Sequence, residues 1–328
     1  MGDSVLKLNE KSILVTGGAG FLGSFLCEEL LCYGIKKLVI MDNFSTGKLW
    51  NLENVKEEKM ATIYNKDLAN YVELEYILDK EKIDVVFNLA VIPLPMSLVK
   101  PKETIDNNVI CTSNLCELLR KEKFKTLIHT SSSEAYGTSL YIDRPMDESH
   151  PTYPITPYAA SKLACDHIVL SYARTFDLDV SIVRPFNMYG PRQNELSYAG
   201  VIPLTIMRIL KGDSPIIFGD GLQTRDYSFV KDIAKIIPKF YEKKETRNKI
   251  INLASGNDIS IKQLIEMIVS IMDYKGEIKY GSARPGDVRH HIGDISLAKK
   301  ILDFSPETDF DSGLKTTINW YKQNFSGR

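Results

Sequence analysis

The stretch Ile13–Leu26, "ILVTGGAGFLGSFL", decides the fold class. An apolar, β-branched run ends in a glycine-rich turn, and the residues after the turn have the periodicity of a helix. Gly17 permits the tight turn, Gly20 lets the backbone approach a pyrophosphate, and Gly23 lets helix and strand pack closely. A phosphate would lie at the helix N-terminus, where unpaired N–H groups and the helix dipole favour an anion.

Further β-branched runs follow this first strand. They are "KLVIMD", "ATIYNKD", "IDVVFNLA", "TLIHTSS", "VSIVRPF" and, later, "KIINLAS", and helical segments separate most of them. Strands that are apolar along their whole length and alternate with helices predict a doubly wound parallel sheet, covered on both faces. We predict a Rossmann domain over residues 1–185, to which the chain returns at about 226–255, and a smaller α/β substrate-binding domain over 186–328.

Asp42 ends the second strand, 19 residues after Gly23. A carboxylate at this position accepts the ribose 2′-hydroxyl and repels a 2′-phosphate, which favours NAD over NADP. Asp67 follows the third strand and is expected either to reach the adenine ring or to cap a turn.

Charge and composition point to a small-molecule partner. The 328 residues include 41 basic and 42 acidic side chains, which leaves no excess charge for nucleic acid or an anionic membrane. No run approaches the roughly 20 apolar residues of a membrane span, and the N-terminus lacks a signal-peptide core. Five scattered cysteines predict buried free thiols in the cytoplasm, and no metal site is expected.

Tyr158 and Lys162 are four residues apart on a predicted helix, and this spacing places them on one face. A neighbouring ammonium favours the phenolate and is expected to lower the tyrosine pKa, so that Tyr158 becomes a general base. Ser132, at the end of another strand, can supply a hydroxyl that orients the substrate. All three converge at the carboxyl edge of the sheet.

The chain resembles the extended short-chain dehydrogenase/reductase family of nucleotide-sugar epimerases, dehydratases and decarboxylases. The motifs that carry the resemblance are "TGGAGFLG", "DNFSTG", "NLA", "SSSEAYG", "PYAASK", "RPFNMYGPRQ", "GDGLQTRDYSFV" and "RPGDVRHHIGD". The resemblance implies bound NAD, a nucleotide-diphosphate sugar substrate, a role in polysaccharide biosynthesis, and Tyr158, Lys162 and Ser132 as the oxidising trio. It also implies a homodimer formed through a four-helix bundle of residues 104–121 and 159–176.

These motifs give three sets of expected site residues. The catalytic set is Ser132, Ser133, Glu134, Tyr158 and Lys162. The cofactor-binding set is Gly17, Gly20, Phe21, Leu22, Gly23, Asp42, Asn43, Asp67, Leu68, Leu89, Ala90, Asn108, Tyr158 and Lys162. The substrate-binding set is Asn187, Val201, Arg225 and Arg284, with the arginines on the diphosphate; each arginine could instead form a surface ion pair with Asp220, Asp226 or Asp287.

Glu134 favours a 4,6-dehydratase. In this family, oxidation at C4 gives a 4-keto sugar whose C5–H is acidic, and elimination of water across C5 and C6 then needs a base, which a carboxylate supplies. Glu134 falls where the 4,6-dehydratases carry glutamate, whereas 4-epimerases do not need this base. UDP-glucuronate decarboxylases resemble the same pattern, and Ser133 stands where many dehydratases have an aspartate acid.

Two alternatives therefore stay open, a 4-epimerase of UDP-sugars and a UDP-glucuronate decarboxylase. The stretch "GPRQNELSYAGVIPLTI" resembles the epimerases at least as much as the dehydratases. A non-catalytic sugar-nucleotide binder would be expected to lose the tyrosine, the lysine or the hydroxyl, and all three are present. The apolar segment around Pro93, Pro95 and Met96 is expected either to tune the sugar site or only to pack, and His129 is expected in the core.

Overall fold

The computed structural model describes residues 6–139, 144–195, 200–284 and 287–325. Its centre is a seven-stranded sheet of β1 (Ser12–Thr16), β2 (Lys37–Asp42), β3 (Ala61–Asn65), β4 (Val85–Asn88), β5 (Thr126–Thr130), β6 (Asp179–Pro185) and β10 (Ile250–Leu253). The strand order is β10-β6-β5-β4-β1-β2-β3, and every neighbouring pair is parallel. The predicted fold class is confirmed, and each of the seven predicted runs forms one of these strands.

Both faces of the sheet are buried, because alternate residues of each strand enter different cores. Ile13 and Val15 of β1 belong to one hydrophobic cluster, and Leu14 belongs to another. The first face is covered by α1 (Phe21–Leu31), α8 (Val230–Ile236) and α11 (Ser296–Leu302), and the second by α3 (Tyr71–Glu81), α5 (Pro101–Arg120) and α6 (Pro157–Phe176). This double burial explains why the strands read as continuous apolar runs.

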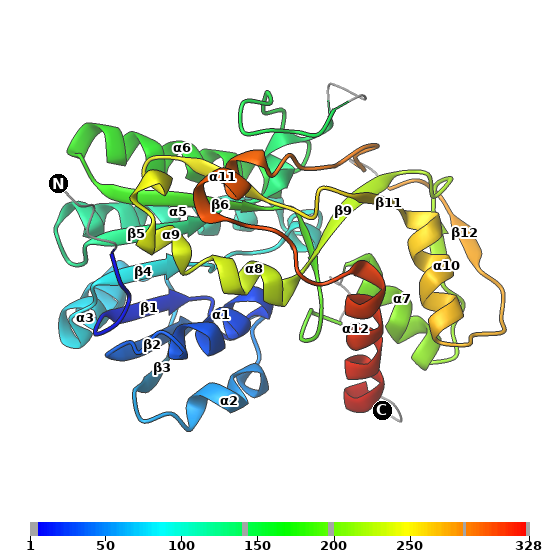
Figure 1. Cartoon of the computed structure of the whole chain (residues 1–328), viewed down its shortest axis with the longest axis horizontal. Coiled ribbons are helices and arrows are strands. Elements are labelled where there is room, and N and C mark those ends of the chain that lie inside the picture. The colour runs from blue at the N-terminus through cyan, green and yellow to red at the C-terminus, as the bar shows by residue number, and fades with distance from the viewer. Residues whose placement is uncertain (1–5, 140–143, 196–199, 285–286, 326–328) are drawn as a thin grey trace.

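The smaller lobe has its own core (Figure 1). It contains β7 (Asn187–Tyr189), β9 (Thr224–Phe229) and β11 (Asp258–Ser260) in one sheet and β8 (Ile216–Phe218) with β12 (Lys279–Gly281) in another, beside α7 (Val201–Leu210), α10 (Ile261–Ile271) and α12 (Phe310–Phe325). A capping box between Ser260 and Gln263 starts α10 by satisfying backbone N–H groups on both sides. Short elements complete the chain: η1 (Leu49–Leu52), α2 (Glu53–Lys56), α4 (Leu94–Ser97), η2 (Ser133–Tyr136), α9 (Lys239–Glu242) and η3 (Lys244–Thr246).

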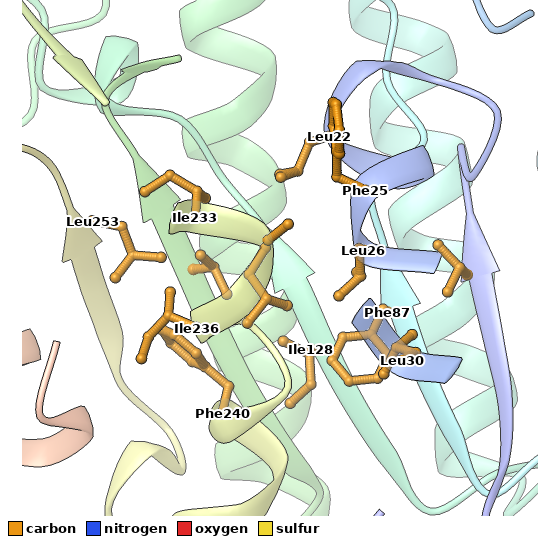
Figure 2. Close-up of a cluster of buried hydrophobic side chains, with 14 of the residues drawn as sticks. Leu22, Phe25, Leu26, Leu30, Phe87, Ile128, Ile233, Ile236, Phe240 and Leu253 are labelled. Atoms are coloured by element: carbon orange, nitrogen blue, oxygen red, sulfur yellow. The ribbon is translucent and has the colours of Figure 1, made fainter. Parts of the chain in front are cut away.

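The chain returns from the smaller lobe to the large sheet twice. In the first return, α8 packs beside α1, and β10 extends the sheet at β6. Figure 2 shows the cluster that α8, α1 and the strands form, with the labelled residues Ile233 and Ile236 of α8, Leu22, Phe25, Leu26 and Leu30 of α1, and Phe87, Ile128 and Leu253 of the strands. In the second return, Ile295–Phe304 joins the same core through α11, which the sequence patterns did not indicate. The domain boundary near residue 185 stays a prediction.

Four of the five cysteines are buried free thiols, whereas Cys32 is exposed because it lies just past the end of α1. Within the part of the chain that the structure describes, no helix is long and apolar enough to cross a bilayer.

Candidate functional site

The sheet reverses its strand order between β1 and β4, and a crevice opens at their carboxyl ends. Gly17 follows β1 with φ +65°, and a Cβ there would lie 2.8 Å from the Ala90 backbone nitrogen. A Cβ on Gly23 would lie 2.2 Å from the Gly17 carbonyl oxygen. Only glycine therefore fits where the turn passes the end of β4 and where α1 meets the turn.

The start of α1 has the form of an anion site. Its N-cap is Gly20, which has no side chain to bond the first N–H groups of the helix. These N–H groups and the helix dipole suit a pyrophosphate. The cradle thus fits a dinucleotide, because backbone rather than side chains lines the phosphate end of the crevice.

Asp42 is held at the edge of this cradle by two backbone hydrogen bonds. Its carboxylate accepts from Ala19 N at 2.9 Å and from Phe44 N at 2.8 Å. Burial raises the pKa of Asp42, and the two backbone bonds oppose that rise. Asp67 both caps a turn, by accepting from Ala69 N at 2.8 Å, and lines the crevice beside Asn43.

A single cavity of about 900 Å³ contains nearly all the expected site residues. The whole catalytic set, the whole substrate-binding set and all of the cofactor-binding set except Asn108 line it. The cavity runs from the cradle across the carboxyl ends of the sheet to the smaller lobe, where Phe218 and Tyr227 lie.

Asn108 lies outside the cavity lining and fixes one of its walls. The buried Asn108 amide accepts from Ile92 N at 2.8 Å, donates to Ile92 O at 3.2 Å and donates to Ser161 Oγ at 3.0 Å. Ser161 lies in α6 beside Lys162. Asn108 therefore connects the segment after β4 to the catalytic helix α6.

Tyr158 and Lys162 lie in the first turns of α6, which Thr156 caps by accepting from Ala159 N at 3.2 Å. Ser132 and Tyr158 both line the cavity, the Ser132 side chain lowers the pKa of the phenol, and Lys162 Nζ donates to the Thr130 carbonyl. The structure thus brings the predicted trio together at the end of β5. A hydroxyl placed between this serine and this tyrosine could lose its proton to the phenolate.

The prediction that Lys162 lowers the pKa of Tyr158 is wrong for this structure. Burial raises the pKa of Tyr158 to about 12, the bond to Ser132 opposes this rise, and the carboxylates of Glu134 and Asp166 add to it. Burial also lowers the pKa of Lys162. Desolvation is the largest cause of both shifts, because it disfavours the charged form of each group.

Glu134 lies in the short helix η2, directly after Ser132. Its backbone N–H donates to Ser132 Oγ at 3.2 Å, and its carboxyl lines the cavity close enough to Tyr158 to affect the phenol. Burial raises the pKa of Glu134, Arg225 opposes the rise, and Asp287 adds to it. Ser133 is buried beside it, with its carbonyl 3.3 Å from His291 Nε2.

The expected substrate residues lie at the far end of the cavity. Arg225 forms the expected ion pair with Asp287, donates to the Thr224 and Val288 carbonyls, and still lines the cavity. The Arg284 guanidinium lies 4.1 Å from the centre of the Phe218 ring. Two guanidinium groups at one end suit a diphosphate, and Asn187 and Val201 lie on the same side.

The apolar segment after β4 lines the cavity through Val91, Ile92, Pro93, Leu94 and Pro95. It therefore borders the cavity, although Met96 lies outside the lining, and its part in tuning the sugar site stays a prediction. His129 is buried in β5 as expected, with Nδ1 3.0 Å from the Asn88 amide nitrogen, and burial lowers its pKa well below the usual value.

Sequence reasoning missed a strap that joins the smaller lobe to α1. The Arg192 guanidinium donates to Glu28 Oε1 at 2.7 Å and Ser24 Oγ at 3.3 Å, and lies 4.4 Å from the Phe25 ring centre. Lys48 forms an ion pair with Glu195 across the same boundary. Arg192 belongs to the stretch "GPRQ" and Lys48 to the stretch "STGK". Each is a charged residue next to or near a glycine, and this was the signal that the sequence offered. Residues 196–199 of the longer stretch "GPRQNELSYAGVIPLTI" lie outside the described residues.

Comparisons with known proteins agree with this geometry. The family model described as GDP-mannose 4,6-dehydratase matches residues 14–317. A putative UDP-glucose 4-epimerase of Methanocaldococcus jannaschii is 36% identical over 95% of this chain and 99% of its own length. The structure of a Thermotoga maritima UDP-glucose 4-epimerase with UDP-glucose has a TM-score of 0.89, 32% identity, and coverage of 95% and 99%. That of the Streptomyces venezuelae dTDP-glucose 4,6-dehydratase DesIV with NAD has a TM-score of 0.90, 26% identity, and coverage of 95% and 97%.

The strap leads to a prediction about cofactor release. We expect Arg192→Ala to speed NAD dissociation by about 10- to 100-fold, because a charge-assisted hydrogen bond contributes roughly 1.5–3 kcal/mol. Stopped-flow displacement of NAD measures the rate. Arg120→Ala is the matched control, since Arg120 pairs with Glu117 on the exposed side of α5. Equal rates of NAD release from both variants and the unmodified protein would show that the strap does not slow NAD dissociation.

Proposed function

Since the chain belongs to the GDP-mannose 4,6-dehydratase family of NAD-dependent nucleotide-sugar enzymes, we propose that it is a nucleotide-diphosphate-sugar 4,6-dehydratase. One observation carries the proposal: Glu134 lines the same cavity as Tyr158, and its charge is near enough to raise the pKa of the phenol. A base that borders the oxidising residue can reach the carbon next to the new ketone.

The first half of the proposed reaction oxidises the sugar at C4. Tyr158 takes the proton of the 4-hydroxyl, and Ser132, whose side chain lowers the pKa of that phenol, orients the same hydroxyl. NAD, when bound, supplies the hydride acceptor for C4. Residues Gly17, Gly20 and Asp42 would hold it, and Arg225 and Arg284 would hold the sugar diphosphate.

The second half removes water. Glu134 takes the C5 proton, and the electron pair forms the enolate of the 4-ketone. The C6–O bond then breaks, and the departing hydroxide leaves as water with a proton from the Glu134 carboxyl. Return of the hydride to C6, and to C5 of the proton that Tyr158 took from the 4-hydroxyl, gives the 4-keto-6-deoxy sugar. Burial raises the pKa of Glu134, which favours a carboxyl that can hold the abstracted proton before it passes it on.

A 4-epimerase is the second candidate, and the comparisons favour it. The M. jannaschii relative at 36% identity is named as a putative UDP-glucose 4-epimerase. An epimerase shares the C4 oxidation and returns the hydride to the other face of C4, so it has no use for a base at C5. Glu134 is therefore the residue whose role separates the two candidates.

The product identifies the reaction directly. We expect the purified protein, incubated with NAD and a panel of uridine, thymidine, guanosine and cytidine diphosphate sugars, to release a product lighter by one water. Mass spectrometry with chromatography reads the outcome. An isomer of unchanged mass would replace the proposal with an epimerase, and loss of carbon dioxide from a uronate would replace it with a decarboxylase.

Substitution of Glu134, the proposed base, should separate C4 oxidation from water loss. We expect Glu134→Gln to slow water loss by about 10²–10⁴-fold, the usual contribution of a general base, while transient NAD reduction continues. In the unmodified enzyme, burial raises the pKa of Glu134. As the pH falls, this carboxylate is therefore protonated at a pH above the ordinary glutamate pKa of about 4.3. The unmodified enzyme should lose elimination activity over that range, and the variant should lack this acidic limb.

Glu148→Gln is the matched control for that experiment. Burial also raises the pKa of Glu148, but this carboxyl accepts from Asn252 N at 2.8 Å and lies outside the cavity lining. We expect it to leave water loss and its pH profile unchanged. Equal loss in both variants would show that Glu134 acts only through folding stability.

The proposal includes a homodimer through α5 and α6. Ile105, Ile110 and Phe176 leave 38%, 44% and 46% of their surface exposed on these two helices, which an isolated subunit would present to water. Light scattering at micromolar concentration should give twice the mass of the chain, and Ile110→Lys should lower it to one chain. A monomeric mass for the unmodified protein would contradict the dimer.

A further inference from the structure

Ser131 lies between two residues that contact the catalytic pair. The Thr130 carbonyl accepts from Lys162 Nζ, and the Ser132 side chain is close enough to Tyr158 to lower the pKa of the phenol. The Ser131 hydroxyl itself donates backwards, to Asp166 Oδ2 at 2.7 Å. Its position therefore sets where both neighbours stand, although its hydroxyl is directed away from the reacting groups.

Asp166 belongs to a buried ion pair beneath the site. Arg184 of β6 donates to Asp166 Oδ2 at 2.5 Å, and both side chains are about 1% exposed. Removing two charges from water costs several kcal/mol, and a buried pair is seldom a net source of stability. A pair kept at this depth is better explained by the geometry that it imposes.

The same ion pair also holds the other end of the catalytic segment. The Arg184 guanidinium lies 4.4 Å from the centre of the Tyr136 ring, and Tyr136 is the last residue of η2. The Tyr136 hydroxyl donates to Asn252 Oδ1 at 2.9 Å in β10. Residues 131–136 are thus fixed at the first position by Asp166 and at the last by Arg184.

We propose that the Asp166–Arg184 pair is a clamp that positions Ser132 and Glu134 against Tyr158 and Lys162. Asp166, Arg184, Ser131 and Tyr136 are positioning residues, since each acts through the segment 131–136. The inference rests on the proposed roles of Ser132, Tyr158 and Lys162 in C4 oxidation. It does not depend on whether Glu134 then removes water.

Ser131→Ala tests the clamp with the ion pair intact. The experiment follows the transient absorbance of reduced nicotinamide when NAD-loaded enzyme meets the nucleotide sugar that it turns over. We expect the rate constant at saturation to fall by about 10²-fold, the typical cost of misplacing a catalytic group by about 1 Å. The KM should change by less than about threefold, because the removed hydroxyl of Ser131, itself a residue of the cavity lining, bonds Asp166, which lies outside that lining.

Ser181→Ala is the matched control. Ser181 is a fully buried serine of β6 whose hydroxyl bonds Thr246 Oγ1 at 2.9 Å, away from the cavity. Both variants lose one buried hydroxyl, so similar losses of thermal stability are expected, and only Ser131→Ala should lose rate. Unchanged oxidation in Ser131→Ala, or an equal loss in Ser181→Ala, overturns the clamp.

Tyr136 tests the other end of the segment. Tyr136→Phe keeps the ring over Arg184 and should retain the oxidation rate to within about threefold, whereas Tyr136→Leu removes the ring and should slow it by about 10-fold or more. Equal rates for the two variants contradict the role of Arg184. Crystal structures of Ser131→Ala and the unmodified enzyme provide a readout independent of turnover: the clamp predicts a displaced Ser132 hydroxyl, and superimposable segments overturn it.

The clamp and the proposed dehydration fail in distinguishable ways. C4 oxidation is common to dehydration and epimerisation, so an unexpected product refutes the role of Glu134 and leaves the clamp standing. Normal water loss with an unaffected Ser131→Ala variant refutes the clamp and leaves the function standing.

Discussion

The close approach of two strand ends is the constraint on which the site depends. Gly17 after β1 passes so near Ala90 after β4 that a single added carbon would lie 2.8 Å from backbone nitrogen. This contact brings the dinucleotide cradle against the segment Leu89–Pro95, which forms the next wall of the cavity. Asn108 then ties that wall to α6 through Ile92 and Ser161. One backbone contact therefore fixes the cradle, the wall and the catalytic helix relative to each other.

Burial governs the chemistry of the catalytic groups in the same way at three positions. It raises the pKa of Tyr158 and Glu134 and lowers that of Lys162, so each group is moved toward its neutral form. The phenol is then a poor base by itself. A positive charge beside it would lower its pKa again, and NAD, when bound, would supply one through its oxidised nicotinamide.

Local sequence patterns predict the structural features that depend on neighbouring residues. They miss the features that depend on contacts between segments far apart in the chain. The glycine turn, the seven apolar strands and the Tyr158–Lys162 spacing each follow from a short stretch of chain, and the structure has them all. The return of Ile295–Phe304 to the large core and the Arg192 strap depend on residues more than a hundred positions away. The pKa of Tyr158 was predicted in the wrong direction because pair spacing is visible in a sequence and desolvation is not.

Our proposal makes one side chain on a shared frame decide the reaction. Solved structures named as a UDP-glucose 4-epimerase and a dTDP-glucose 4,6-dehydratase fit this chain about equally, with TM-scores of 0.89 and 0.90. The fold is therefore shared by the two reactions, and only residues of the site can distinguish them. Here the Glu134 N–H donates to the hydroxyl of Ser132, whose side chain lowers the pKa of Tyr158. This bond ties the backbone of Glu134 to the proposed oxidising trio, which is the placement that our proposal of proton removal from the adjacent carbon requires.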